Sequence, residues 1–170
     1  MKRNGMYALH FHSPALIGGR LTYLHGRQFA GRVIALCFLP YAGLLSVGEI
    51  DRHAARFQQI GAALLIVDSS ARPLHRVWVD QPEKPSTPIL ADPCGRLHRS
   101  FGVAVMQSTP RCRTFVIDRA GILRLRVSHD FVDAGLEVLR RIVGLDHIHA
   151  SHSMAAGEDT MDAATECVRA

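Results

Sequence analysis

The sequence has no apolar segment long enough to cross a membrane. A membrane-spanning helix needs roughly 18–20 consecutive apolar residues, whereas the longest apolar run here, residues 33–39, has the length of a strand. The basic N-terminus is followed by His10, His12 and Pro14, which interrupt the apolar stretch that a signal peptide requires. We therefore expect a cytoplasmic chain without a membrane partner.

Aromatic residues are also scarce, at 6% of the 170 residues. Proteins that bind nucleic acid usually carry a concentrated basic stripe, and those that bind single strands add aromatic stacking platforms. The formal net charge is +5, but the basic residues are spread along the chain. The composition favours a solvated basic surface and argues against a nucleic-acid partner.

The cysteines lack the spacings of thiol-exchange and zinc motifs. The chain has four of them, Cys37, Cys94, Cys112 and Cys167, and no two form a C-x-x-C pair. In a cytoplasmic chain we expect them to be reduced thiols. Nothing in their arrangement indicates a cofactor.

Two strands and a capped helix are the clearest elements of the first half. Residues 32–39 and 62–68 are almost continuously apolar, which is typical of strands that are covered on both faces. Between them, Ser46 and Glu49 have the spacing of a capping box, in which each side chain binds a backbone N–H group at the start of a helix. We expect that helix to run to about Ile60.

The second half contains a further helix, a β-hairpin and a last helix. Ser69 or Ser70 can cap a helix that continues through Trp78, and a short extended piece and a short helix follow it. Two strands flank residues 119–121 and predict a hairpin. A final helix is expected over residues 130–143.

This order of elements predicts an α/β fold of the thioredoxin-like kind. Buried parallel strands joined by helices, followed by an antiparallel hairpin, give a mixed central β-sheet flanked by helices on both faces. We expect an N-terminal arm over residues 1–19, one domain over 20–144, and a flexible tail rich in His and acidic residues over 145–170. The tail contains three histidines that make a weak candidate for a metal site, His147, His149 and His152.

Several segments resemble, in order and spacing, the alkyl hydroperoxide reductase/thiol-specific antioxidant family, the peroxiredoxins. The resemblance covers roughly residues 20–144, and it implies a thioredoxin-like fold and surfaces that allow a homodimer. The segments that carry it are 31–40, 64–69, His75 to Trp78, 88–95, 101–103 and 113–122.

The segment that carries the family's chemistry does not match. The family pattern is Pro-x-x-x-Thr-x-x-Cys, and in its place stand Pro40, Leu44 and Val47, or Ser46 if one residue is deleted. Neither register supplies sulfur. Peroxide reduction needs a thiolate that becomes sulfenic acid and is reduced again, and a serine hydroxyl is too weak an acid for this. We interpret Ser46 as a helix N-cap.

The arginine that stabilises the thiolate in this family lies just before a Phe-x-Ile-Asp strand. In strict register that position is Cys112, with Arg111 and Arg113 on either side. Either of these arginines could point into the site. Arg113 is our candidate, and an ordinary surface arginine is the alternative.

The remaining cysteines are weak redox candidates. Cys37 lies in the middle of an apolar strand and is interpreted as a buried thiol, although a Cys37–Cys112 redox pair is conceivable because their strands are neighbours in this fold. Cys94 lies in a turn and should be exposed. It is therefore another position to which the reactive thiol could have moved.

Three hypotheses about function follow. The leading one is a peroxiredoxin-family domain without the usual thiol-peroxidase chemistry, which serves as a binding or regulatory relative with a protein partner. The alternative is an active thiol-dependent peroxidase or oxidoreductase that uses Cys94 or Cys112. The third is a metal-binding or chaperone-like role of the His-rich ends.

Overall fold

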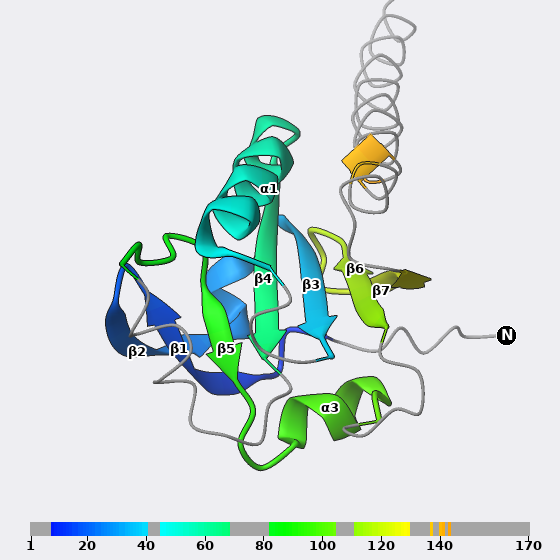
Figure 1. The fold of residues 1–170 in the computed structure, drawn as a ribbon. Helices are drawn as coiled ribbons and strands as arrows, with labels where there is room; N and C mark the ends of the chain where they lie inside the picture. The colour runs from blue at the N-terminus through cyan, green and yellow to red at the C-terminus, as the bar shows by residue number, and fades with distance from the viewer. Residues whose placement is uncertain are drawn as a thin grey trace, which may run out of the picture.

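The computed structural model describes residues 8–40, 45–68, 82–104 and 111–129, together with residues 137, 140, 141 and 143. Its strands form one sheet in the order β2-β1-β5-β4-β3-β6-β7 (Figure 1). The elements are β1 (His12–Ile17), β2 (Arg20–His25), the 3₁₀ helix η1 (Gly26–Phe29), β3 (Val33–Leu39), α1 (Val47–Gln59), β4 (Ala62–Asp68), β5 (Ile89–Ala91), α3 (Arg96–Phe101), β6 (Cys112–Ile117) and β7 (Leu123–His129).

The centre of the sheet is built from the two apolar runs of the first half. β3 pairs in parallel with β4, and β4 pairs in parallel with β5. On its other side β3 pairs antiparallel with β6, which in turn forms the predicted hairpin with β7. All seven residues of β4 are buried, because both faces of the sheet are covered at this point.

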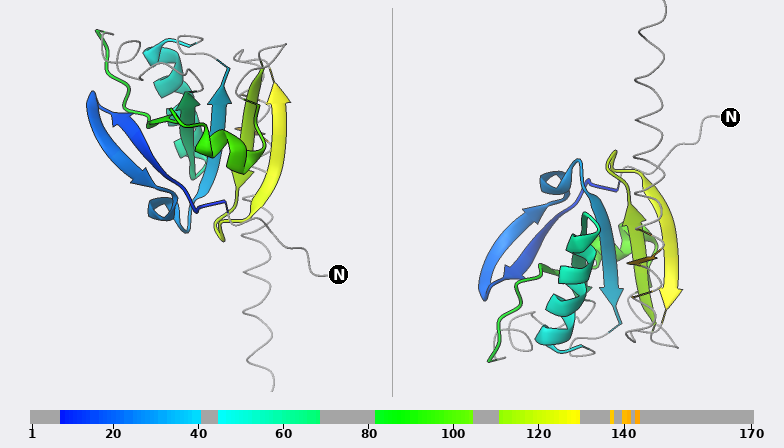
Figure 2. Two further views of the ribbon diagram at one scale, coloured as in Figure 1. Left: turned by 90° about the horizontal axis from the view of Figure 1, so that it is seen from below. Right: turned by 90° about the horizontal axis from the view of Figure 1, so that it is seen from above.

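Helices cover both faces of the sheet, so the predicted layers are confirmed (Figure 2). α1 packs on one face, where Ile50 and Phe57 join the apolar side chains of β3 and β4. α3 packs on the opposite face, where Leu97 and Phe101 meet Phe38 and its neighbours. Because successive residues of a strand point to opposite faces, each strand residue belongs to either the α1 face or the α3 face.

The prediction of an N-terminal arm over residues 1–19 was wrong for residues 12–17. These residues form β1, which pairs antiparallel with β2 and with β5, and Ala15 and Leu16 are buried. The Ser13 hydroxyl also donates a hydrogen bond to the Ala91 carbonyl, which joins β1 to the end of β5. The partner β5 lies more than seventy residues further along the chain, so no local pattern could reveal the pairing.

Some predicted elements lie outside the described residues. These are the helix predicted over residues 69–78 and the tail over 145–170. Four residues of the last predicted helix are described, and all four are helical. Within the part of the chain that the structure describes, no helix is long and apolar enough to span a membrane.

Candidate functional site

The start of α1 is the position at which a reactive thiol would be expected from the resemblance. Ser46 stands there as the N-cap, and its Oγ accepts a hydrogen bond of 3.3 Å from the Glu49 backbone N–H. The Ser46 backbone N–H and hydroxyl both donate to Glu49 Oε2, at 2.8 and 2.7 Å. The predicted capping box is therefore confirmed, and it uses the hydroxyl proton of Ser46 and one of its acceptor sites.

The capping box also fixes a negative charge at this helix terminus. The hydrogen bonds from the Ser46 backbone and side chain lower the pKa of Glu49 below its usual value. Glu49 is thus a carboxylate at neutral pH. A carboxylate beside the helix terminus opposes the anions that such a terminus would otherwise attract.

A cap of this kind predicts a purely structural effect. Ser46→Ala should lower the free energy of unfolding by about 1 kcal/mol and leave any reactivity toward hydroperoxides unchanged. Urea unfolding and a peroxide assay measure the two quantities. The matched control is Ser100→Ala, which removes an exposed hydroxyl bound to the Arg96 carbonyl within α3 and should cost less. A change in reactivity without a loss of stability would contradict the interpretation of Ser46 as a cap.

Val47, the residue that follows Ser46, places a buried apolar side chain at the start of α1. Val47 is 5% exposed and Leu45 is 7% exposed, and both belong to the apolar cluster on the α1 face that also contains Leu39 and Cys112. Pro40, at the end of β3, is half-buried. Leu44 lies outside the described residues. The described surroundings of Val47 are therefore apolar.

Arg113 does not join Ser46 and Val47. It lies opposite Phe38 in the β3–β6 pairing and alternates with Cys112 and Thr114, so it belongs to the α3 face. Its Nε atom is buried and has no hydrogen-bond partner among the described residues. The position on β6 that does face α1 is occupied by Cys112, and the site has no arginine from this strand.

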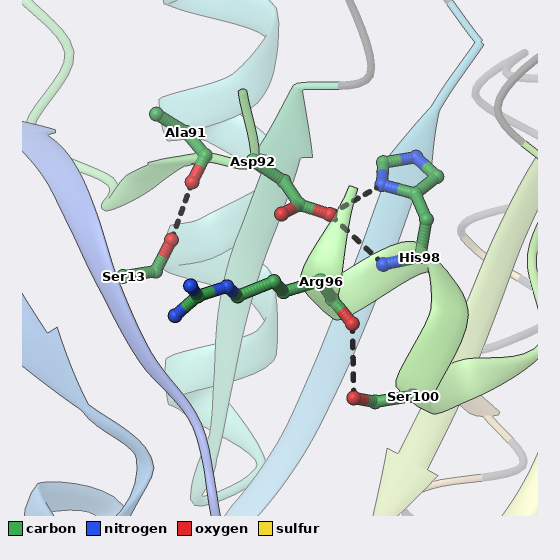
Figure 3. Close-up of polar contacts among 6 residues, drawn as sticks. All are labelled: Ser13, Ala91, Asp92, Arg96, His98 and Ser100. Carbon is green, nitrogen blue, oxygen red and sulfur yellow. Dashed lines mark hydrogen bonds and ion pairs between the residues drawn. The ribbon is translucent and has the colours of Figure 1, made fainter. Parts of the chain in front are cut away.

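Cys94 is exposed, as the sequence predicted. It lies in the turn before α3, and Asp92 fixes this turn by accepting a hydrogen bond of 2.9 Å from the His98 backbone N–H and contacting His98 Nδ1 at 2.7 Å (Figure 3). α3 has only six residues, so few peptide dipoles add up at its start. The turn gives Cys94 an exposed place without a long helix behind it.

The comparisons with known proteins agree with this fold. The sequence model of the AhpC/TSA family matches residues 21–126. This chain belongs to the AhpC/TSA family. Alkyl hydroperoxide reductase E of Mycobacterium tuberculosis is 32% identical over 112 residues, which are 62% of this chain and 72% of that protein. Peroxiredoxin-2 of Cricetulus griseus is 26% identical over 131 residues, which are 71% and 66% of the two chains.

Solved structures confirm the thioredoxin-like α/β architecture of this AhpC/TSA domain. The crystal structure of Enterococcus faecalis AhpC superposes with a TM-score of 0.70 at 23% identity, covering 84% of this chain and 91% of that one. The reduced 2-Cys peroxiredoxin of Plasmodium vivax gives a TM-score of 0.69 at 19% identity, with 83% and 94% covered. The resemblance to peroxiredoxins that the sequence indicated is thus confirmed.

Two cysteines of this AhpC/TSA domain meet in its core. Cys37 on β3 is 0% exposed and Cys112 on β6 is 1% exposed. The strands pair antiparallel, with Cys37 opposite Thr114, and Cys112 in turn lies opposite His129 on β7. The expectation that the two cysteine-bearing strands are neighbours is confirmed. Thr114 and His129, however, were not identified from the sequence.

The four side chains form a polar cluster inside the apolar core, which we call the thiol cluster (Cys37, Cys112, Thr114 and His129). Thr114 Oγ1 lies 2.8 Å from His129 Nε2. Burial by itself raises the pKa of the Cys37 thiol. Hydrogen bonds from Cys112, His129 and Thr114 and the positive charge of His129 outweigh it and lower that pKa to about 6. These contacts favour the thiolate form of Cys37.

The alternation of apolar and polar residues over 123–129 indicates the face of the strand on which His129 lies. Leu125 and Val127 pack against the apolar cluster of the α1 face, and His129 continues the same side of the strand. Its position could have been inferred, but its neighbours depend on the register of three strands.

The metal hypothesis has no candidate among the described residues. In that part of the chain, no three His, Cys, Asp or Glu side chains are arranged to hold a metal ion. The proposed ligands His147, His149 and His152 lie outside the described residues.

Proposed function

We propose that this AhpC/TSA domain does not reduce peroxides at the start of α1 and acts as a binding or regulatory relative of the peroxiredoxins. One observation carries the proposal. The helix terminus holds a serine whose hydroxyl is bound to Glu49, followed by a buried valine. Peroxide reduction requires a sulfur that becomes first a thiolate and then a sulfenic acid. Neither the serine hydroxyl nor the valine side chain can form these states.

The charges around this position support the same proposal. Peroxide reduction by a thiolate is favoured by cations and by a helix N-terminus, both of which lower the pKa of the thiol. Here the Glu49 carboxylate sits at the helix N-terminus, and Arg113 belongs to the opposite face of the sheet. The start of α1 thus carries a carboxylate and a hydroxyl in place of a thiolate, and β6 supplies no arginine to this face of the sheet.

A regulatory relative needs a partner, and we propose that the partner is a protein, either another copy of this chain or a different protein. The relatives that the comparisons name include peroxiredoxins, and the resemblance to that family implies surfaces that allow a homodimer. We further propose that the chain acts in the cytoplasm, where its thiols are kept reduced. Light scattering after gel filtration would show whether the chain forms a homodimer.

The test of this function is a peroxide-consumption assay. With dithiothreitol, thioredoxin or glutathione as the reductant, we expect no sustained consumption of hydrogen peroxide by the native chain. The exposed Cys94 and the buried Cys112 are the positions from which an alternative thiol peroxidase would act. Sustained turnover that disappears in Cys94→Ser or Cys112→Ser would therefore overturn the proposal and identify the thiol responsible.

A further inference from the structure

The thiol cluster contains what a reversible thiol oxidation requires. Cys37 and Cys112 lie on adjacent strands and are not joined by a disulfide, Cys37 lies within hydrogen-bonding reach of Cys112 and His129, and Thr114 Oγ1 lies 2.8 Å from His129 Nε2. Cysteine alone can serve as a small apolar residue in a core. A pair of cysteines with a bound imidazole is a different arrangement, because it combines a nucleophile, a second sulfur and a proton carrier.

We propose that Cys37 and Cys112 form a redox-active dithiol, which a hydroperoxide oxidises to an intramolecular disulfide while His129 transfers the protons. This inference goes beyond the proposed function, which concerns the start of α1. It assigns a modification site to the middle of the sheet, and its oxidant is a hydroperoxide by chemical class.

The oxidation takes place in two steps that balance. In the first, the Cys37 thiolate attacks one oxygen of the hydroperoxide, the O–O bond breaks, and the leaving alkoxide takes a proton from the His129 imidazolium to give an alcohol. In the second, Cys112 loses its proton to His129 and attacks the sulfenic sulfur of Cys37. The S–O bond breaks, and the hydroxide takes that proton to leave as water. Two thiols and one hydroperoxide give one disulfide, one alcohol and one water.

Cys37 is the better nucleophile of the pair. Despite burial, which raises its pKa, the hydrogen bonds from Cys112, His129 and Thr114 lower its pKa and so favour its thiolate form, and the imidazole that stabilises the thiolate is the same group that supplies the proton. A thiol with a pKa somewhat below the ambient pH combines a high thiolate fraction with useful nucleophilicity. Cys112 then acts as the resolving thiol.

The strand geometry makes the disulfide reversible. Cys37 lies opposite Thr114, so Cys112 is its diagonal neighbour on β6. Diagonal neighbours in an antiparallel pair have Cα atoms roughly 7–8 Å apart, whereas a relaxed disulfide joins Cα atoms at most about 7 Å apart. Formation of the bond must shift β3 and β6 locally along one another, and a disulfide under such strain is more easily reduced than a relaxed one once a reductant reaches it.

The burial of the two cysteines distinguishes the thiol cluster from the active site of a peroxidase. Cys37 and Cys112 are 0% and 1% exposed, so a hydroperoxide reaches them only during local opening of the core. A reductant, dithiothreitol included, reaches the disulfide only during the same opening, and a protein reductant is excluded further because it is larger. The dithiol should therefore consume about one hydroperoxide per chain and then stop, which is the behaviour of a sensor and leaves the absence of sustained turnover unaffected.

Oxidation would also alter the surface of the domain. His129 is on β7, which is the edge strand of the sheet, and Cys112 is its pairing partner. When the sulfurs join, His129 loses the thiolate beside it. The change is transmitted to a strand whose other face presents Arg124, Arg126 and Ser128 to solvent, where a protein partner can detect it.

The test uses the full chain with Cys94→Ser and Cys167→Ser, which keeps only the two buried thiols. The folded protein is treated with hydrogen peroxide, then unfolded, alkylated and weighed by mass spectrometry. We expect both thiols to be lost together, with a mass loss of two hydrogen atoms per chain that dithiothreitol reverses once the chain is unfolded. Recovery of both thiols under conditions that oxidise Cys94 in the native chain would overturn the proposal.

Three further variants separate the roles within the pair. Cys112→Ser should give sulfenic acid at Cys37 that dimedone traps, whereas Cys37→Ser should leave Cys112 unreacted. His129→Gln should slow the oxidation at pH 7 by about tenfold and move the midpoint of its pH profile upward. Ser128→Ala, on the exposed side of β7, is the matched control and should leave the rate unchanged.

Two results on these variants would also reject the proposal. One is equal oxidation of Cys112 in the presence and absence of Cys37. The other is an unchanged pH profile in a folded His129→Gln chain. If His129→Gln does not fold, the test is the trapping of sulfenic acid by dimedone in Cys112→Ser. A Cys112→Ser chain that does not react with dimedone after peroxide treatment would reject the proposal. These results concern the redox-active dithiol alone. The proposed function would fail by a different result, namely sustained peroxide turnover.

Discussion

Phe38→Ala is expected to lower the free energy of unfolding by about 3–5 kcal/mol. Phe38 is 1% exposed on β3, and its ring contacts the rings of Phe101, Phe115 and His98 at centroid distances of 5.6, 5.4 and 4.9 Å. Truncation removes the buried ring and leaves a cavity where β3, β6 and α3 meet. Such a loss is a large fraction of the roughly 5–15 kcal/mol that stabilises a typical domain.

Denaturant unfolding followed by circular dichroism measures this effect. The matched control is Leu21→Ala on β2, because Leu21 is 55% exposed and its truncation creates no internal cavity. The control should change the free energy of unfolding by less than about 0.5 kcal/mol. Equal effects of the two substitutions would show that the aromatic cluster under α3 is not packed as described.

The second large effect is expected for Asp92→Ala, at about 2–4 kcal/mol of unfolding free energy. The Asp92 and His98 side chains are 5% and 1% exposed, and the carboxylate binds both the backbone N–H and the ring of His98 (Figure 3). Its removal leaves two buried polar groups of His98 without this acceptor. Asp92→Asn is the matched control, since it keeps one oxygen acceptor and should cost less.

The same residue predicts a dependence of stability on pH. Burial raises the pKa of Asp92, but the hydrogen bonds from His98 and Leu97 and the charge of His98 outweigh it, so the folded-state pKa is lowered. Its contribution to stability is therefore present above the unfolded-state pKa of about 3.9 and is lost as the pH falls through the lowered folded-state value. Unfolding measured across this acidic range should show a smaller slope for Asp92→Asn. An unchanged slope would contradict the assignment.

Asp51 adds to the same acid sensitivity from another part of the domain. Its carboxylate accepts hydrogen bonds from the backbone N–H groups of Ser86 and Thr87, at 3.0 and 2.9 Å, and joins α1 to the loop before β5. The Thr87 hydroxyl also donates to Asp51 Oδ1, at 2.6 Å. Burial raises the pKa of Asp51, but the hydrogen bond from this hydroxyl, together with those from the two backbone N–H groups, outweighs it and lowers the pKa. The free energy of unfolding should therefore fall less steeply with decreasing pH in Asp92→Asn, but it should still fall, because Asp51 is unchanged.

Local patterns in the sequence predicted most of the elements of this domain correctly. The apolar runs became β3 and β4, the spacing of Ser46 and Glu49 became the cap of α1, and the hairpin appeared as β6 and β7. Each of these features depends on a few neighbouring residues, which is why reading the sequence suffices for them. β1 was missed because its partner β5 is remote in the sequence and only three residues long.

The sequence by itself determined that the chain has the order of elements of the AhpC/TSA family and no sulfur at the start of α1. Only the tertiary structure decided that Arg113 belongs to the face opposite Val47 and that His129 and Thr114 surround Cys37. The reason is strand register. A shift of one residue between β3, β6 and β7 would reverse the faces of these side chains, and that register is set by the packing of the whole sheet.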